Sequence, residues 1–120
     1  MAKILIVEDD EMISGMYKIK LAQDGYEVVL AANGIEAIGM VEQEKPDLIL
    51  LDVIMPGLDG FSVLEDFRKN KKLKTPIILL TNLGTEEDKK KGEEMGANGY
   101  LVKASLTPTE VSAEVKKYLK

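Results

Sequence analysis

The chain has 120 residues, of which 45% are apolar and 31% are charged, and it carries a net charge of −5 at pH 7. This length fits a single domain, residues 1–120, and the balance is that of an ordinary globular protein. The chain has no cysteine and no histidine, which excludes disulfides, thiolate zinc sites and Cys–His or Ser–His catalysis, and the negative charge argues against nucleic acid as a partner.

Short apolar runs alternate with helical patterns along the whole chain. The runs predict strands at residues 4–7, 28–30, 48–51, 77–80 and 100–102. Each run is continuous rather than alternating, which is typical of strands covered on both faces in a parallel sheet. No run approaches the roughly 20 apolar residues that cross a bilayer, and no signal-peptide pattern is present. We therefore expect a cytoplasmic protein with no membrane contact.

Four amphipathic patterns lie between and after these runs. In each of them apolar residues recur every three or four positions, as in a helix with one buried face. The patterns are Ile13, Met16, Tyr17 and Leu21; Ile35, Ile38 and Val41; Phe61, Leu64 and Phe67; and Val111, Val115 and Leu119. The last helix has a complete start signal, with Thr107 as N-cap, Pro108 at the first position and Glu110 closing a capping box.

The stretch from Thr85 to Met95 predicts a different kind of helix. It has almost no apolar face, and Gly92 lies in its interior. Pairs at i,i+4, such as Glu87 with Lys91, contribute only a few tenths of a kcal/mol each. We expect this helix to end at Gly96, to be weakly anchored and to be the moving element. A solvated loop is predicted before the fourth strand for the basic run Arg68, Lys69, Lys71, Lys72 and Lys74.

Five strand–helix units with short links predict an α/β fold, a doubly wound five-stranded parallel sheet with five helices. In such sheets ligands bind beyond the carboxyl ends of the strands, at the point where the strand order reverses. The residues at those ends are Glu8, Asp9, Asp52, Thr81 and Lys103. We expect these side chains to lie along one edge of the sheet.

This set of side chains fits a metal ion and a phosphoryl group. Carboxylates on neighbouring strands repel one another unless a cation lies among them. With only oxygen ligands on offer, the cation is expected to be Mg²⁺, or Mn²⁺ in its place. Asp52 can attack phosphorus as a nucleophile, Thr81 can donate to a phosphoryl oxygen, and Lys103 adds positive charge. Taken singly, Thr81 would be an ordinary strand-end residue and Lys103 a surface charge.

Four strings resemble the receiver domain of two-component response regulators, in that family's order and spacing over the whole chain: ILIVEDD, PDLILLDVIMPGLDG, PIILLTN and GYLVKA. The resemblance implies the flavodoxin-like strand order 2-1-3-4-5. It implies that Glu8 and Asp9 are the acidic pair, that Asp52 is the phosphoacceptor, and that the backbone carbonyl of Ile54 is a further metal ligand. It also implies that Thr81 is the switch hydroxyl, Tyr100 the switch aromatic and Lys103 the phosphate-binding lysine.

The same resemblance implies partners and a readout. The family takes its phosphoryl group from a phosphohistidine of a sensor histidine kinase or phosphotransfer protein, or from small donors such as acetyl phosphate. It catalyses only its own phosphorylation and dephosphorylation. Phosphorylation is expected to draw in Thr81 and Lys103, turn Tyr100 inward and shift the fourth helix.

With no output domain within residues 1–120, we expect a stand-alone, chemotaxis-regulator-like switch, although the receiver part of a longer regulator would look the same. It would signal to an output protein of unknown identity through its fourth helix, fifth strand and fifth helix. A monomer that can dimerise when phosphorylated is the expected state.

Three residues depart from the family's pattern. Ala104 replaces the proline that usually follows the lysine, often after a cis bond. A cis bond before a non-proline residue costs about 3 kcal/mol, so we expect a trans peptide. Asn82 is bulkier than the usual small residue and is expected either to shield the phosphoryl group or to hydrogen-bond it. Ile54 places an apolar side chain beside the phosphosite.

Three other functions remain as alternatives. A flavin-binding electron carrier of the same fold needs a Ser/Thr/Gly-rich phosphate loop after the first strand, where this chain has the acidic run 8–11. A phosphatase with an aspartyl nucleophile typically has a second acid two residues later, where this chain has Ile54. A phosphorylation-independent scaffold, or a redesigned receiver, would keep the metal site without a conformational response.

Overall fold

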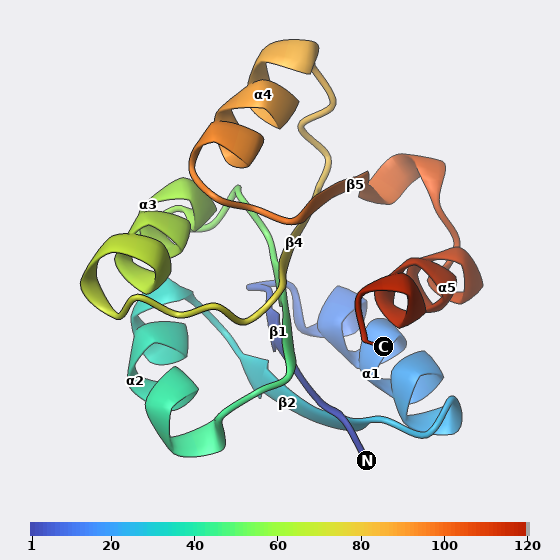
Figure 1. The fold of residues 1–120 in the computed structure, drawn as a ribbon. Coiled ribbons are helices and arrows are strands. Elements are labelled where there is room, and N and C mark those ends of the chain that lie inside the picture. Colours follow the sequence, from blue (N-terminus) through green and yellow to red (C-terminus); the bar gives the residue numbers. More distant parts are fainter. Residues whose placement is uncertain (120) are drawn as a thin grey trace.

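The computed structural model describes residues 1–119, and at its centre lies a five-stranded parallel sheet in the order β2-β1-β3-β4-β5 (Figure 1). The strands are β1 (Lys3–Val7), β2 (Glu27–Ala31), β3 (Leu48–Leu51), β4 (Ile77–Thr81) and β5 (Gly99–Val102). The predicted doubly wound sheet and its flavodoxin-like order are therefore confirmed. Lys120, the last residue of the predicted domain, lies outside the described residues.

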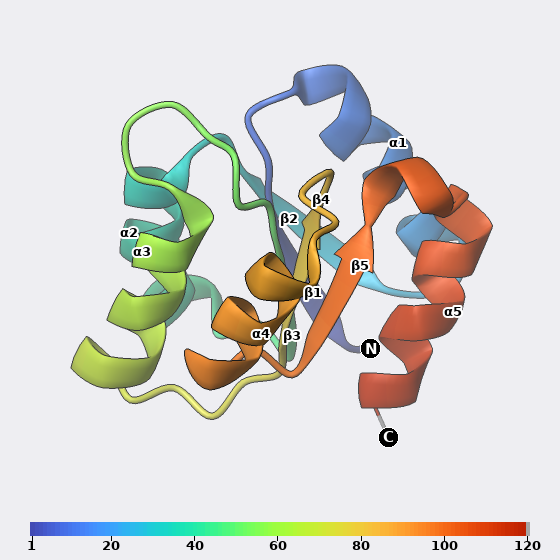
Figure 2. The same ribbon diagram turned by 90° about the horizontal axis from the view of Figure 1, so that it is seen from above.

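Helices cover both faces of this sheet, as Figures 1 and 2 show. On one face lie α1 (Glu11–Gln23) and α5 (Pro108–Tyr118), and on the other lie α2 (Gly34–Glu44), α3 (Gly60–Glu65) and α4 (Glu86–Glu94). Two short helices follow other elements directly: a π-helix (Asp66–Asn70) after α3 and a 3₁₀-helix (Lys103–Ser105) after β5.

The central strands explain why their apolar runs are continuous. Ile4 and Ile6 of β1 pack in the core under α1 and α5, whereas Leu5 and Val7 pack in the core under the other three helices. Because side chains of a strand alternate between its faces, a strand buried on both sides must be apolar at every position. Each fully buried Leu or Ile contributes about 1.5–3 kcal/mol. The edge strands β2 and β5 are only partly buried.

Polar side chains cap the start of every α-helix. Each cap accepts backbone N–H groups of the first turn, which otherwise have no partner in the helix. The caps are Asp10, Asn33, Asp59, Thr85 and Thr107 for α1 to α5 in turn. The capping box of Thr107 and Glu110 is confirmed. Asp10, although next to the acidic pair, is occupied as the cap of α1.

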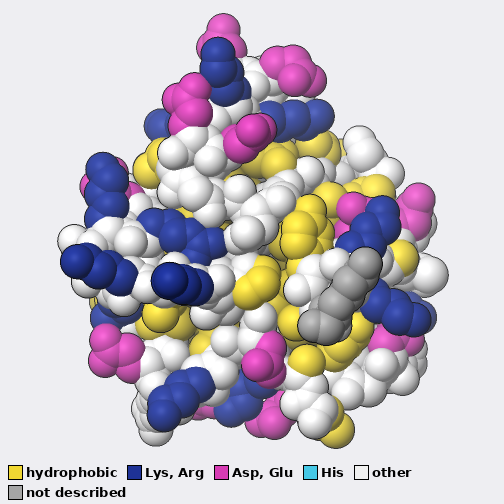
Figure 3. Space-filling model, viewed as in Figure 1, with side chains coloured by type: hydrophobic (Ala, Val, Ile, Leu, Met, Phe, Trp, Pro, Cys, Tyr) yellow, Lys and Arg dark blue, Asp and Glu magenta, His cyan; other side chains and the backbone are white. Residues whose placement is uncertain are grey.

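The fourth helix is held to the sheet through a glycine. Gly92 is its buried residue, and an added Cβ there would lie 2.6 Å from Leu79 Cδ1. The predicted pairing of Glu87 with Lys91 is wrong, because Lys91 Nζ lies over the Phe61 ring of α3, 4.3 Å from its centroid. Charged side chains of both signs cover α4, and apolar side chains gather between α4 and α5 (Figure 3). The expected lack of an apolar face is confirmed.

The prediction of a solvated loop for the basic run is wrong at its start. Arg68 and Lys69 belong to the π-helix after α3. The guanidinium of Arg68 donates four hydrogen bonds, here called the Arg68 clamp: to Gly96 O at 2.9 Å, Leu73 O at 2.7 Å, Thr75 O at 2.9 Å and Asn98 Oδ1 at 2.7 Å. The clamp joins the end of α3 to the segments before β4 and β5. Hydrophobic periodicity carries no information on such long-range polar contacts.

Among residues 1–119, none of the helices combines the length and the hydropathy that a membrane span requires.

Candidate functional site

Three charged side chains meet at the carboxyl edge of the sheet. Asp52 directly follows β3 and Glu8 directly follows β1, and both are buried, with exposed fractions of 6% and 5%. Lys103 follows β5, and its Nζ donates to Asp52 Oδ2 at 3.0 Å and also to Glu8 Oε1. Since β1 and β3 are neighbours in the sheet, its parallel topology brings these residues together, as the sequence predicts.

The charges at this edge perturb one another. Burial raises the pKa of the Glu8 carboxyl to about 7, with the Lys103 ammonium opposing the rise and Asp52 adding to it. Burial also disfavours the charge of Lys103, but its hydrogen bonds to Glu8 and Asp52 outweigh burial and raise the pKa of Lys103. The site therefore contains more negative charge than its lysine alone compensates.

The acidic residues are arranged as a cation would require. Oxygen atoms of Glu8, Asp9 and Asp52 all lie within 4.8 Å of one another. Asp9 is exposed, whereas the other two carboxylates are buried, so the cluster opens to solvent at Asp9. A set made only of carboxylate oxygens suits a hard cation such as Mg²⁺, and the residues present therefore fit the predicted metal.

Backbone contacts fix the segment that carries Asp52. The Ile54 N–H donates to Asp52 Oδ1 at 3.2 Å, and the Ile54 side chain is 56% exposed. The Gly60 N–H donates to the Val53 carbonyl at 2.9 Å. These contacts hold the carboxylate of Asp52 at one position relative to the strand end.

Thr81 and Tyr100 are linked through Leu83. Thr81 ends β4 and is fully buried, and its Oγ1 accepts the Leu83 N–H at 3.4 Å. The Tyr100 hydroxyl donates to the Leu83 carbonyl at 2.6 Å, and the side chain of Tyr100 is half-buried. The two residues predicted to switch thus contact the same residue of the β4–α4 loop.

The peptide before Ala104 is trans, as predicted, since the described chain contains no cis peptide bond. The structure gives Asn82 a contact that the sequence does not indicate. Its Oδ1 accepts the backbone N–H of Ala104 at 3.1 Å, so this oxygen is bound to the loop after β5.

Tyr17 is a neighbour of the site that sequence reasoning treats only as part of an apolar helix face. It is 3% exposed and lines a cavity of about 10 Å³ together with Glu8, Asp52 and Lys103. Burial raises the pKa of the Tyr17 hydroxyl, with Lys103 opposing the shift and the two carboxylates adding to it. The available signal was a hydroxyl-bearing ring among the apolar residues predicted to line one face of this helix.

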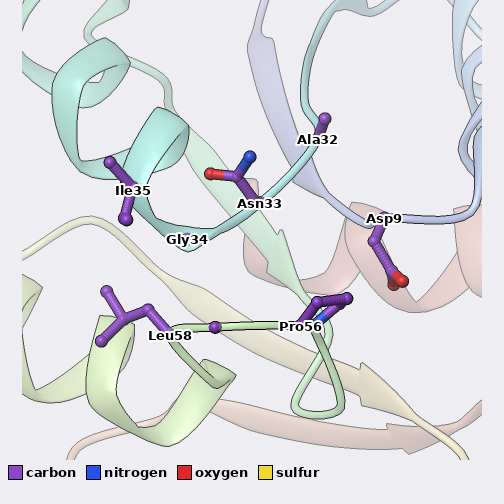
Figure 4. A pocket seen from close by; sticks show the side chains of 8 residues that line it. Asp9, Ala32, Asn33, Gly34, Ile35, Pro56 and Leu58 are labelled. Atoms are coloured by element: carbon purple, nitrogen blue, oxygen red, sulfur yellow. The ribbon is translucent and has the colours of Figure 1, made fainter.

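A surface pocket of about 370 Å³ opens beside Asp9 (Figure 4). Asn33, Gly34 and Ile35 at the start of α2 form one wall, and Pro56 and Leu58 of the loop after β3 form the other. The Asp9 side chain lies at the end of this pocket, and the side chain of Ile35 is 73% exposed. The acidic cluster of Glu8, Asp9 and Asp52 therefore borders an open, partly apolar pocket at Asp9.

Known proteins resemble this chain in sequence and in structure. The sequence profile of the response regulator receiver domain matches residues 4–116. The chain is 45% identical over 118 residues to the alkaline phosphatase synthesis transcriptional regulatory protein PhoP of Bacillus subtilis (strain 168), a match that covers 98% of this chain and 48% of that protein. The chain thus spans about half the length of the curated relatives it matches.

Solved structures agree. The chain superposes on the chemotaxis protein CheY4 of Vibrio cholerae with a TM-score of 0.92, 37% identity and coverage of 99% of both chains. The BeF3-activated N-terminal receiver domain of Klebsiella pneumoniae RstA gives a TM-score of 0.91, 34% identity and coverage of 98% of both chains. The chain therefore belongs to the response regulator receiver domain family of two-component systems, whose members act in phosphorylation-dependent signalling, bind Mg²⁺ at an acidic cluster and interact with histidine kinases and output domains.

Proposed function

We propose that this chain is a switch that accepts one phosphoryl group on Asp52, with Mg²⁺ held by Glu8, Asp9, Asp52 and the backbone carbonyl of Ile54. The observation that carries the proposal is the buried Asp52 carboxylate, which has an ammonium at 3.0 Å and two further carboxylates within 4.8 Å. A nucleophile, a fixed positive charge and a cation site side by side are the parts that phosphoryl transfer needs.

The transfer proceeds from the phosphohistidine of a sensor kinase or phosphotransfer protein. An oxygen of Asp52 attacks phosphorus, the P–N bond breaks, and the imidazole nitrogen keeps the electron pair and later takes a proton. Lys103 and the Thr81 hydroxyl stabilise the negative charge on the phosphoryl oxygens. Bound Mg²⁺ would supply further neutralisation of that charge. Hydrolysis reverses the modification: water attacks phosphorus, the P–O bond to Asp52 breaks, and phosphate leaves.

The signal passes from Thr81 to the outer face formed by α4, β5 and α5. Thr81 accepts the N–H of Leu83, and Tyr100 donates to the Leu83 carbonyl. A movement of the Thr81 hydroxyl toward a phosphoryl group would therefore shift Leu83 and change the hydrogen bond of the Tyr100 hydroxyl. The buried residue of α4, the first helix on that path, is a glycine, Gly92. Displacement of α4 would change the surface offered to an output protein or to a second copy of the chain.

The proposal is tested by intact-mass measurement after incubation with Mg²⁺ and acetyl phosphate or phosphoramidate. We expect one added phosphoryl group that is lost in Asp52→Ala and in the absence of metal. Asp9→Asn is expected to lower the affinity for Mg²⁺, so that more Mg²⁺ is needed for the same phosphorylation. Asp10→Asn keeps the cap of α1 and serves as the matched control. Metal binding without an adduct from either donor would instead favour a phosphorylation-independent scaffold.

A further inference from the structure

A side-chain hydrogen bond joins two loops at the edge of the site. Asn82 directly follows Thr81, and its Oδ1 accepts the N–H of Ala104 at 3.1 Å. Ala104 is the second residue of the 3₁₀-helix Lys103–Ser105, and the first N–H groups of a helix have no partner within it. A proline at position 104 would have no N–H to donate. The contact therefore involves two of the three residues at which this chain departs from the family's pattern, Asn82 and Ala104.

The contact lies where it can control Lys103. Lys103 directly precedes Ala104, and its Nζ reaches Asp52 and Glu8. Because β4 lies between β3 and β5, the lysine side chain has to extend across the end of β4 to reach Asp52. A lysine side chain loses much rotamer freedom when it is held in one position. Its placement thus depends on how firmly the backbone at Lys103 is fixed.

No other hydrogen bond of the described chain joins the β4–α4 loop to this 3₁₀-helix. Leu83, the next residue of the loop, binds Thr81 through its N–H and Tyr100 through its carbonyl. The side-chain amide of Asn82 is therefore the polar link between the loop that follows Thr81 and the 3₁₀-helix that begins at Lys103.

We infer that Asn82 is a positioning residue for Lys103, because its hydrogen bond to Ala104 fixes the start of the 3₁₀-helix and keeps Lys103 Nζ beside Asp52. The inference rests on the proposed function of Asp52 as phosphoacceptor and concerns the rate of that transfer. An ammonium acts most strongly where negative charge develops during transfer. A displaced lysine therefore lowers the maximal rate of phosphorylation more than it weakens binding of the donor.

The test compares the wild type, Asn82→Ala, Lys103→Ala and the double variant, phosphorylated by acetyl phosphate with Mg²⁺ and followed by intact mass. We expect Asn82→Ala to lower the maximal rate of phosphorylation about fivefold, which corresponds to the loss of one ordinary hydrogen bond. The donor concentration that gives half of the maximal rate should not change. In the Lys103→Ala background the same change is expected to have no further effect. Asn70→Ala is the matched control, since Asn70 is an exposed asparagine that bonds Asp66, away from the site.

An unchanged maximal rate in Asn82→Ala, or an equal fall in both backgrounds, would overturn the inference while leaving the proposed function intact. If the wild type itself takes up no phosphoryl group, the proposed function fails, and the position of Lys103 is then read by NMR of protein labelled with nitrogen-15 lysine. The ammonium signal of Lys103 is expected to shift in Asn82→Ala, and an unshifted signal would overturn the inference.

Discussion

At Gly60 the first turn of α3 passes against the backbone of the proposed phosphoacceptor. An added Cβ at this position would lie 2.1 Å from the Asp52 carbonyl oxygen and 2.6 Å from Val53 Cα. Backbone atoms cannot rotate away as the end of a side chain can. Any side chain at position 60 would therefore displace the strand end that carries Asp52.

We expect Gly60→Ala to lower the free energy of unfolding by about 3 kcal/mol, the upper part of the range for overpacking, and to slow phosphorylation. Gly39→Ala is the matched control, because Gly39 is exposed in α2 and an added Cβ there meets nothing within 4 Å. That variant should gain about 0.5–1 kcal/mol, since alanine favours helix more than glycine does. Urea unfolding measures both changes. If Gly60→Ala were as stable as the wild type, the backbone at Asp52 could make room for a side chain at position 60, which would contradict the tight packing described above.

The residues of the site that could be predicted are those placed by strand ends. Glu8, Asp52 and Thr81 follow or end buried apolar runs, and a parallel sheet brings such ends to one edge. Tyr17 could not be predicted as a neighbour of Lys103, because its position depends on how α1 packs against the sheet. The contact between Asn82 and Ala104 also lay beyond prediction, since it depends on the conformations of two loops far apart in sequence.

Among the elements, α4 differs most from its neighbours. Helices α1 and α5 bury large apolar side chains such as Tyr17, Leu21 and Val115, whereas the buried residue of α4 is Gly92. Its Lys91 ammonium lies over the Phe61 ring of α3, whereas the ion pair of Lys89 with Glu86 lies within α4 itself. A cation–π contact at an exposed site is worth roughly 1 kcal/mol or less, so it adds little to the hold on α4. The lack of a large buried side chain on α4 was predictable from its composition, but the stacking of Lys91 on Phe61 was not.

The Arg68 clamp fixes the turn that follows α4. Its four hydrogen bonds reach the turn after α4 and the segments that lead into β4 and β5. We expect Arg68→Ala to lower the free energy of unfolding by about 2–4 kcal/mol, because several carbonyl groups lose a charged donor. Lys69→Ala removes the next basic residue, whose side chain is 74% exposed, and should change stability by less than about 0.5 kcal/mol. Equal, small effects of the two substitutions in urea unfolding would contradict this role of Arg68.

At the scale of the whole molecule, the candidate site exists only when the sheet is complete. Its side chains follow or end β1, β3, β4 and β5, and no single strand–helix unit carries more than part of the set. Ligands of such a site bind the folded chain and not the unfolded one. Binding at the carboxyl edge is therefore coupled to the global stability of the fold.

Mg²⁺ is accordingly expected to stabilise the protein, since the three carboxylates come within 4.8 Å of one another only when β1 and β3 are paired. At free Mg²⁺ tenfold above its Kd, the free energy of unfolding should rise by about 1.4 kcal/mol. Asp9→Asn should lose most of this gain, whereas Asp10→Asn, which retains a cap for α1, should keep it. Urea unfolding in MgCl₂ and in KCl at equal ionic strength separates binding from charge screening. A gain in Asp9→Asn as large as in the wild type would mean that Mg²⁺ stabilises the chain elsewhere and would contradict the metal site proposed at Glu8, Asp9 and Asp52.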